Sequence, residues 1–233
     1  MVLHGVTAVL LPGTGSDDDY IRRAFDSPLQ HVGAELVTHR PQPERLIEDY
    51  LEALDAAATR SGPILAGGVS IGAAVAAAWA LRHPAQVVGV LAALPAWTGS
   101  PDNAPAAQAA RYSAEQLRND GLDAVVAQMR ASSPPWLGDE LTRSWTAQWP
   151  QLPNALEEAA AYVAPTHAEL AALTVPMGVT AAVDDAVHPL QAASEWANAA
   201  PRAVLHTVTL DQIGADPTAL GSACVSALIA AAG

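Results

Sequence analysis

The stretch AGGVSIGAAVAAAWALRHP (Ala66–Pro84) decides the fold, because a serine stands between glycines where an apolar run meets a series of alanines. The segment Gly68–Gly72 matches the pattern G-x-S-x-G, with a predicted strand before it and a predicted helix after it. Such a turn pushes the hydroxyl of Ser70 out of the sheet, and Gly68 and Gly72 lack the Cβ atoms that would clash. The following helix directs free N–H groups and the positive end of its dipole at an anion formed there. The pattern predicts that Ser70 occupies a nucleophile position, and a purely structural turn is the alternative.

Short β-branched runs alternate with alanine-rich helical segments along most of the chain. This alternation is typical of an α/β fold with a mostly parallel central sheet and helices on both faces. The six expected strands are Val6–Gly13, Ala34–His39, Pro63–Ser70, Val87–Pro95, Pro176–Val183 and Ala203–Leu210. The expected helices between them are Asp18–Phe25, Pro43–Ala58, Ile71–His83, Pro189–Ala199 and Pro217–Ala231.

The interval from Gly99 to Thr174 interrupts this alternation. Its apolar residues recur with a helical period, and no part of it alternates as a strand does. Three of the six tryptophans lie in it (Trp136, Trp145, Trp149), and Trp97 stands at its entrance. We therefore expect residues 1–98 and 175–233 to form one core and residues 99–174 to form a helical insertion.

Length, charge and cysteine content narrow the class of protein. The 233 residues suit one large domain, and the net charge of -13 disfavours nucleic acid and anionic membranes as partners. Cys224 is the single cysteine, and the sequence opens without a recognisable signal peptide, so a cytoplasmic protein is the default expectation. No cluster of His, Cys and Glu has metal-ligand spacing, and neither a metal nor an organic cofactor is expected.

With the serine turn, three further segments give the chain a resemblance to the α/β-hydrolase family over nearly its whole length. These are the loop LLPGTGS (Leu10–Ser16), the segment LPAW (Leu94–Trp97) before the insertion, and VDDAVHP (Val183–Pro189). The resemblance implies a serine esterase-like or acyl-hydrolase scaffold in which the insertion is a lid over the active site. It does not specify the substrate.

The loop after the first strand has a predicted role in binding an oxyanion. The resemblance implies one backbone N–H from Thr14, and the residue after the nucleophile, Ile71, supplies the second. The loop can at the same time start a helix capped by Ser16 or Asp17. A phosphate-binding loop is the competing interpretation of GTGSDDD (Gly13–Asp19), but it lacks the required third glycine or Gly-Lys pair, and its acids would repel a phosphate.

The resemblance also implies an acid and a base, and the base is not at its usual place. Asp185 fits the acid best, with Asp184 as the alternative. The family's histidine follows the last strand, where this chain has Gly214-Ala215. His188 is the candidate for a displaced base, although a loop histidine beside the helix-starting Pro189 is the more common arrangement.

The leading expectation is an enzyme that hydrolyses a small apolar carboxylic ester or related acyl substrate through an acyl-serine intermediate. The absent histidine motivates two alternatives. One is a catalytically impaired protein of the same fold that binds a small apolar ligand or a partner. The other is a lyase or isomerase that uses the same pocket. The sequence leaves the oligomeric state open.

Overall fold

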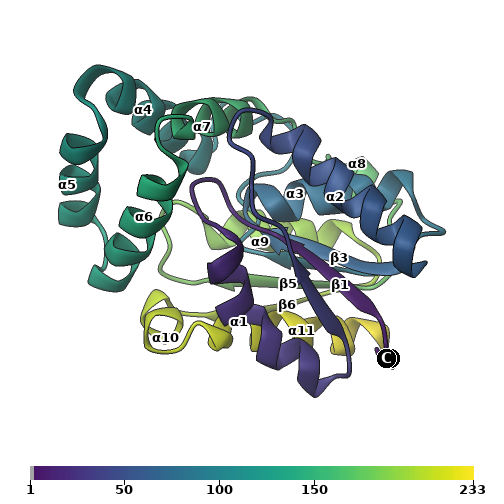
Figure 1. Cartoon of the computed structure of the whole chain (residues 1–233). Coiled ribbons are helices and arrows are strands. Elements are labelled where there is room, and N and C mark those ends of the chain that lie inside the picture. Colours follow the sequence, from purple (N-terminus) through teal and green to yellow (C-terminus); the bar gives the residue numbers. More distant parts are fainter. Residues whose placement is uncertain (1–2) are drawn as a thin grey trace.

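The computed structural model describes residues 3–233 and contains a six-stranded, all-parallel sheet in the order β2-β1-β3-β4-β5-β6 (Figure 1). The fold class and all six strands expected from the sequence are confirmed. The strands are β1 (Thr7–Leu11), β2 (Glu35–Thr38), β3 (Ile64–Val69), β4 (Val87–Ala93), β5 (Met177–Ala182) and β6 (Ala203–Val208). Because every strand runs in the same direction, the loops that follow the strands all gather at one edge of the sheet.

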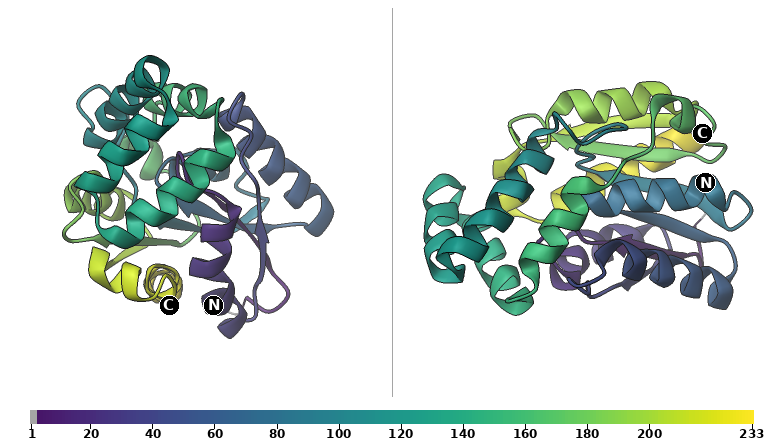
Figure 2. Two further views of the ribbon diagram at one scale, coloured as in Figure 1. Left: turned by 60° about the vertical axis from the view of Figure 1, so that its left-hand side comes forward. Right: turned by 90° about the horizontal axis from the view of Figure 1, so that it is seen from above.

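Helices cover both faces of the sheet and produce two apolar cores (Figures 1 and 2). One face carries α1 (Asp18–His31) and α11 (Thr218–Ala232), and the other carries α2 (Leu46–Ser61), α3 (Ile71–Arg82) and α9 (Leu190–Ala199). Successive side chains of β1 point to opposite faces of the sheet. Ala8 and Leu10 belong to one core, and Val9 and Leu11 belong to the other.

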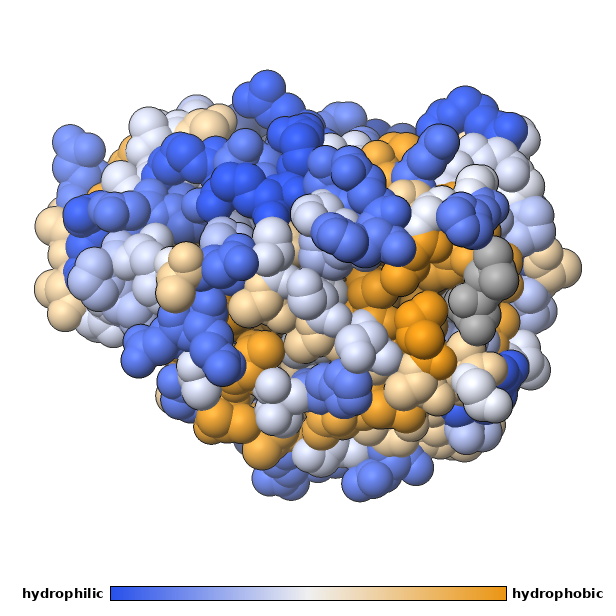
Figure 3. Space-filling model, turned by 90° about the horizontal axis from the view of Figure 1, so that it is seen from below, coloured by the Kyte–Doolittle hydropathy of each residue, from blue (hydrophilic) through white to orange (hydrophobic). Residues whose placement is uncertain are grey.

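The face formed by α1 and α11 has an uneven surface (Figure 3). Hydrophilic side chains gather on one side of it, and hydrophobic patches lie on the other. Helix α11 carries no charged residue, whereas α1 begins with two aspartates. In the part of the chain that the structure describes, no helix combines the length and hydrophobicity needed to cross a membrane.

Between β4 and β5 the fully described chain forms five helices and no strand. They are α4 (Pro105–Asp120), α5 (Leu122–Ser132), α6 (Pro135–Gln148), α7 (Leu152–Ala161) and α8 (His167–Leu170). Helices α4 to α7 surround a small apolar cluster of their own and stand at one end of the sheet (Figure 2). Their side chains share a pocket with residues that follow β1, β3, β4, β5 and β6, so they cover the edge at which the strands end.

Candidate active site

Ser70 lies in a strained turn between β3 and α3. Its backbone has φ 55° and ψ -116°, and only Leu94 among the other described non-glycine residues also has a positive φ. The N–H of Ser70 donates to the carbonyl of Ala93 at 2.9 Å, which ties the turn to the end of β4. Strained backbone of this kind costs on the order of 1–3 kcal/mol and is concentrated at functional sites.

The two glycines of the turn allow the loop after β1 to lie directly against it. A Cβ on Gly68 would come within 2.5 Å of the carbonyl oxygen of Leu11, and one on Gly72 within 2.7 Å of that of Pro12. Both clashes would be with backbone atoms, which cannot rotate away. The spacing of the motif therefore brings the serine and the β1 loop side by side.

One histidine and one aspartate complete a hydrogen-bonded chain with Ser70. The Nε2 atom of His188 lies 3.0 Å from Oγ of Ser70, and its Nδ1 atom lies 2.8 Å from Oδ2 of Asp185. These are the geometric relations that a nucleophile, a base and an orienting carboxylate require. The structure thus brings together three of the residues singled out from the sequence, with His188 at the position next to the serine.

The loop that holds His188 folds around the Asp185 carboxylate. Oδ1 of Asp185 accepts hydrogen bonds from the N–H groups of Val187 at 2.8 Å and His188 at 3.0 Å. Burial of Asp185 raises its pKa, but the imidazole and these two N–H groups outweigh the burial and lower the pKa to about 2. Asp185 is therefore ionised at neutral pH and holds the imidazole with Nδ1 protonated, which leaves Nε2 free to accept the Ser70 proton.

Asp184, the alternative acid, has a different partner. Its Oδ1 accepts the N–H of Leu210 at 2.8 Å, which links the loop after β5 to the segment after β6. Among the described residues, no hydrogen bond or ion pair joins it to His188 or Ser70. This geometry favours Asp185 for the acid.

The segment after β6 forms a short helix, α10 (Leu210–Ala215), which sequence reasoning did not anticipate. Thr209 and Gln212 form a capping box at its start, a signal that is visible in the sequence as T-x-x-Q. Leu210 and Ile213 line the pocket, and a Cβ on Gly214 would collide with the indole of Trp136. The place of the family's histidine is thus occupied by a helix that supplies apolar wall.

Of the two predicted oxyanion donors, Thr14 lines the same pocket as Ser70, and Ile71 directly follows Ser70 in the chain. Among the described residues, the N–H of Thr14 meets no hydrogen-bond acceptor, and Ile71 is the first residue of α3, where N–H groups have no partner within the helix. Gly13 is close to Ser70, since a Cβ built on it would lie 3.5 Å from Cβ of Ser70. Asp17 also caps α1 by accepting the N–H of Tyr20, which confirms the helix-capping interpretation of the loop, while its role in binding an oxyanion stays a prediction.

The pocket above Ser70 has a cavity volume of about 320 Å³ and mostly apolar walls. Leu94 and Trp97 contribute from the sheet side, and the insertion contributes a larger set: Ala106, Ala109, Ala110, Met129, Trp136, Leu137, Leu141, Trp145, Leu156, Ala159 and Ala160. Of the residues that the structure describes, no lysine or arginine lines it, and Asp185 and Glu140 are its only carboxylates. The pocket therefore suits a neutral, apolar group.

The low pKa of Asp185 predicts a stability difference that depends on pH. Asp185→Asn is expected to unfold about 2 kcal/mol more easily than the wild type at pH 6, because a pKa of about 2, against 3.8 unperturbed, stabilises the folded ionised form. This contribution is complete above the unperturbed pKa and is lost as the pH falls through the folded pKa. The gap between the variants, measured by urea unfolding, should therefore shrink between pH 4 and pH 2.

Asp120→Asn, at the exposed end of α4, is the matched control and should show no such gap. A difference between Asp185→Asn and the wild type that stays constant over this pH range would contradict the assignment of the low pKa.

Comparison with known proteins places this fold among the α/β-hydrolases. The sequence model of the family described as serine aminopeptidase, S33 (Hydrolase_4), matches residues 33–213, well over half of the chain. The chain belongs to this family, and the resemblance expected from its sequence is confirmed. Membership of this family identifies the protein as a hydrolase. No curated protein sequence matches it significantly.

Solved structures with the same fold are distant in sequence. A carboxylesterase structure from Nitrososphaera gargenis has a TM-score of 0.72 at 15% identity, over 90% of this chain and 84% of that one. The putative non-heme bromoperoxidase BpoC from Mycobacterium tuberculosis has a TM-score of 0.70 at 17% identity, over 98% and 94%. The enol-lactonase from Burkholderia xenovorans has a TM-score of 0.65 at 18% identity, over 89% and 84%. At these identities the similarity establishes the fold.

Proposed function

We propose that the protein is a serine hydrolase that cleaves small, neutral, apolar carboxylic esters. The observation that carries the proposal is the unbroken hydrogen-bonded path from Asp185 through His188 to Ser70, with distances of 2.8 Å and 3.0 Å. The alternatives of an impaired binding protein or a lyase were motivated by the missing histidine after β6. The position of His188, whose Nε2 atom lies 3.0 Å from Oγ of Ser70, supports the hydrolase over these alternatives.

The proposed reaction follows from the positions of these groups. His188 Nε2 takes the proton of Ser70 as Oγ attacks the ester carbonyl, and the N–H groups of Thr14 and Ile71 stabilise the resulting oxyanion. His188 then gives the proton to the departing alcohol, which leaves an acyl-Ser70 intermediate. Water, deprotonated by His188, attacks the acyl carbon, and the bond to Oγ of Ser70 breaks to release the acid. His188 returns the proton to Oγ, which regenerates the free enzyme. Asp185 stays ionised and stabilises the imidazolium that forms in each half of the reaction.

The substrate class is argued from the charges of the pocket. The family's description names an aminopeptidase, and an aminoacyl substrate would need a carboxylate to bind its ammonium group. Asp185 is bonded to His188, and Glu140 forms ion pairs with Arg23 and Arg143. With both carboxylates of the pocket already paired, a neutral acyl group fits better than a charged one.

The helices from α4 to α7 act as the lid in this proposal. They supply most of the apolar wall, including Trp136 and Trp145, and they separate the serine from bulk water on one side. An ester with an aliphatic or aromatic acyl group of about four to eight carbons is a reasonable match for a cavity of about 320 Å³.

Labelling with a fluorophosphonate tests the proposal directly. The wild type should react stoichiometrically, and mass spectrometry of its peptides should place the label on Ser70. The same preparation should hydrolyse p-nitrophenyl butyrate, and labelling should abolish this turnover. A folded wild-type protein that neither takes up the label nor turns over p-nitrophenyl esters of any acyl length would refute the hydrolase proposal.

A further inference from the structure

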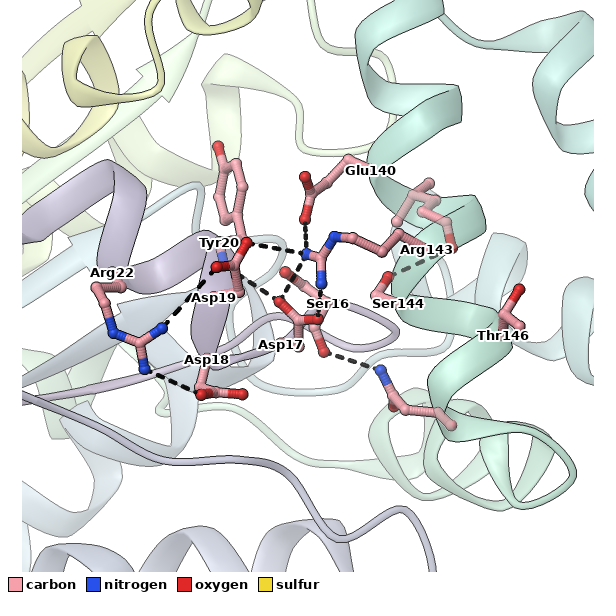
Figure 4. A network of polar contacts seen from close by, with 12 residues as sticks. Ser16, Asp17, Asp18, Asp19, Tyr20, Arg22, Glu140, Arg143, Ser144 and Thr146 are labelled. Carbon is pink, nitrogen blue, oxygen red and sulfur yellow. Dashed lines mark hydrogen bonds and ion pairs between the residues drawn. The ribbon is translucent and has the colours of Figure 1, made fainter.

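Helix α6 of the insertion is bound to the loop that follows β1 through polar side chains (Figure 4). Both terminal nitrogens of Arg143 donate to the carboxylate of Asp17, at 2.6 Å and 2.9 Å. The hydroxyl of Ser144 donates to the carbonyl of Gly15, and the amide of Gln148 donates to the carbonyl of Ser16 at 2.9 Å. Three side chains of one helix thus hold Gly15, Ser16 and Asp17 in turn.

Burial indicates that these contacts are built into the fold. The side chain of Ser144 is fully buried, and Gln148 is 9% exposed. A buried hydroxyl or amide is costly unless it is hydrogen-bonded, and here the loop carbonyls are the partners. Trp145 packs on the same loop, because a Cβ on Gly15 would come within 3.2 Å of its Cδ1 atom.

The turn within this loop connects the residues bound by α6 to Thr14, the proposed oxyanion donor. The N–H of Ser16 donates to the carbonyl of Gly13 at 3.0 Å, which closes a tight turn with Thr14 and Gly15 at its centre. Gly15 has φ 73°, a value that a residue with a side chain rarely adopts. Since Gly13 lies against Ser70 and Asp17 is fixed by Arg143, the direction of the Thr14 N–H depends on both ends of the turn.

We propose that Arg143 is a positioning residue that, with Ser144 and Gln148, holds the Gly13–Asp17 loop so that the Thr14 N–H points at the developing oxyanion. This rests on the proposed hydrolase function. The insertion then contributes to the chemical step as well as to the pocket wall. Asp19 and Glu140 also pair with Arg143 and stabilise its guanidinium in this orientation (Figure 4). Arg23 pairs with the same two carboxylates.

The experiment compares Arg143→Ala with Arg118→Ala as its matched control. Arg118 also makes an ion pair within the insertion, with Glu157, but it has no contact with the loop. For p-nitrophenyl butyrate we expect Arg143→Ala to lower kcat about 10- to 100-fold with KM changed less than threefold, because removing an oxyanion donor outright costs about 10²- to 10³-fold. Arg143→Lys should recover only part of this loss, because lysine keeps the positive charge but cannot bond both carboxylate oxygens of Asp17 in the same way. Arg118→Ala should stay within twofold of the wild type.

The affinity for a trifluoromethyl ketone distinguishes positioning of the oxyanion donor from a merely structural role of Arg143, which would leave this affinity unchanged. The ketone's hemiketal with Ser70 carries the oxyanion, so its Kd should rise in Arg143→Ala by the same factor by which kcat/KM falls. Ser144→Ala, which removes the bond to the Gly15 carbonyl, should show the same pattern and carries the test if Arg143→Ala does not fold.

The outcomes separate the two proposals. If Arg143→Ala and Ser144→Ala match Arg118→Ala in kcat and ketone affinity, or if they raise only KM, the positioning role is wrong while the hydrolase function stands. If the wild type itself neither hydrolyses the ester nor binds the ketone, the proposed function is wrong.

Discussion

Replacing Ser70 by alanine is expected to lower kcat/KM for p-nitrophenyl butyrate by about 10⁵- to 10⁶-fold. The alanine removes the atom that attacks the carbonyl, and His188 then has no hydroxyl to activate. Serine proteases that lose a member of their triad fall by comparable factors, and the activity that remains comes from the oxyanion hole and binding. The comparison is made by steady-state hydrolysis at pH 7–8, with protein purified in parallel.

Ser113→Ala is the matched control, because Ser113 lines the same pocket and, among the described residues, makes no hydrogen bond with His188. It should keep kcat within a few-fold of the wild type. Retention of more than a tenth of the activity by Ser70→Ala would exclude Ser70 as the nucleophile.

Replacing His188 by alanine is expected to lower kcat by about 10⁴- to 10⁶-fold while the fold stays intact. Without the imidazole, the Ser70 proton has no acceptor at 3.0 Å, and the carboxylate of Asp185 loses the group through which it acts. Because His188 is a half-buried loop residue, its removal opens little space in the core. Circular dichroism and thermal unfolding of the variant should therefore resemble those of the wild type.

Two further observations sharpen this prediction. His167→Ala serves as the control, since His167 is exposed and its ring lies beside Glu195, and this variant should be as active as the wild type. Added imidazole should restore part of the activity of His188→Ala by entering the space that the ring leaves. Full activity of His188→Ala would mean that another histidine, such as His31 or His167, reaches Ser70 when substrate is bound.

The sheet and the serine turn were predictable because their signals are local. A β-branched run, a glycine-flanked serine and an alanine-rich helix follow one another within residues 63–83, and each short segment carries its own pattern. The same holds for the β1 loop. Helix boundaries were less exact: α1 continues to His31, past the expected end at Phe25, with Pro28 inside it.

The contacts of the site were harder to predict because they join residues that are far apart in the chain. His188 and Ser70 are separated by 118 residues, and they meet because they follow β5 and β3, which lie on either side of β4 in one parallel sheet. The available local signal was the spacing D-x-x-H, which lets one carboxylate accept two backbone N–H groups and also reach the ring. The hydrogen bonds between α6 and the β1 loop had no such local signal in the sequence, because polar residues on a helix usually face water.

The short loop that carries both Asp185 and His188 concentrates the proposed proton-transfer groups in four consecutive positions. Residues 189–233, including α10 and α11, then contribute packing and pocket wall and no member of the triad. Substitutions in this last fifth of the chain would act on stability or on the shape of the acyl site and leave the proton path intact. In the proposed mechanism, substitutions of α10 side chains would therefore change the substrate without replacing a catalytic group.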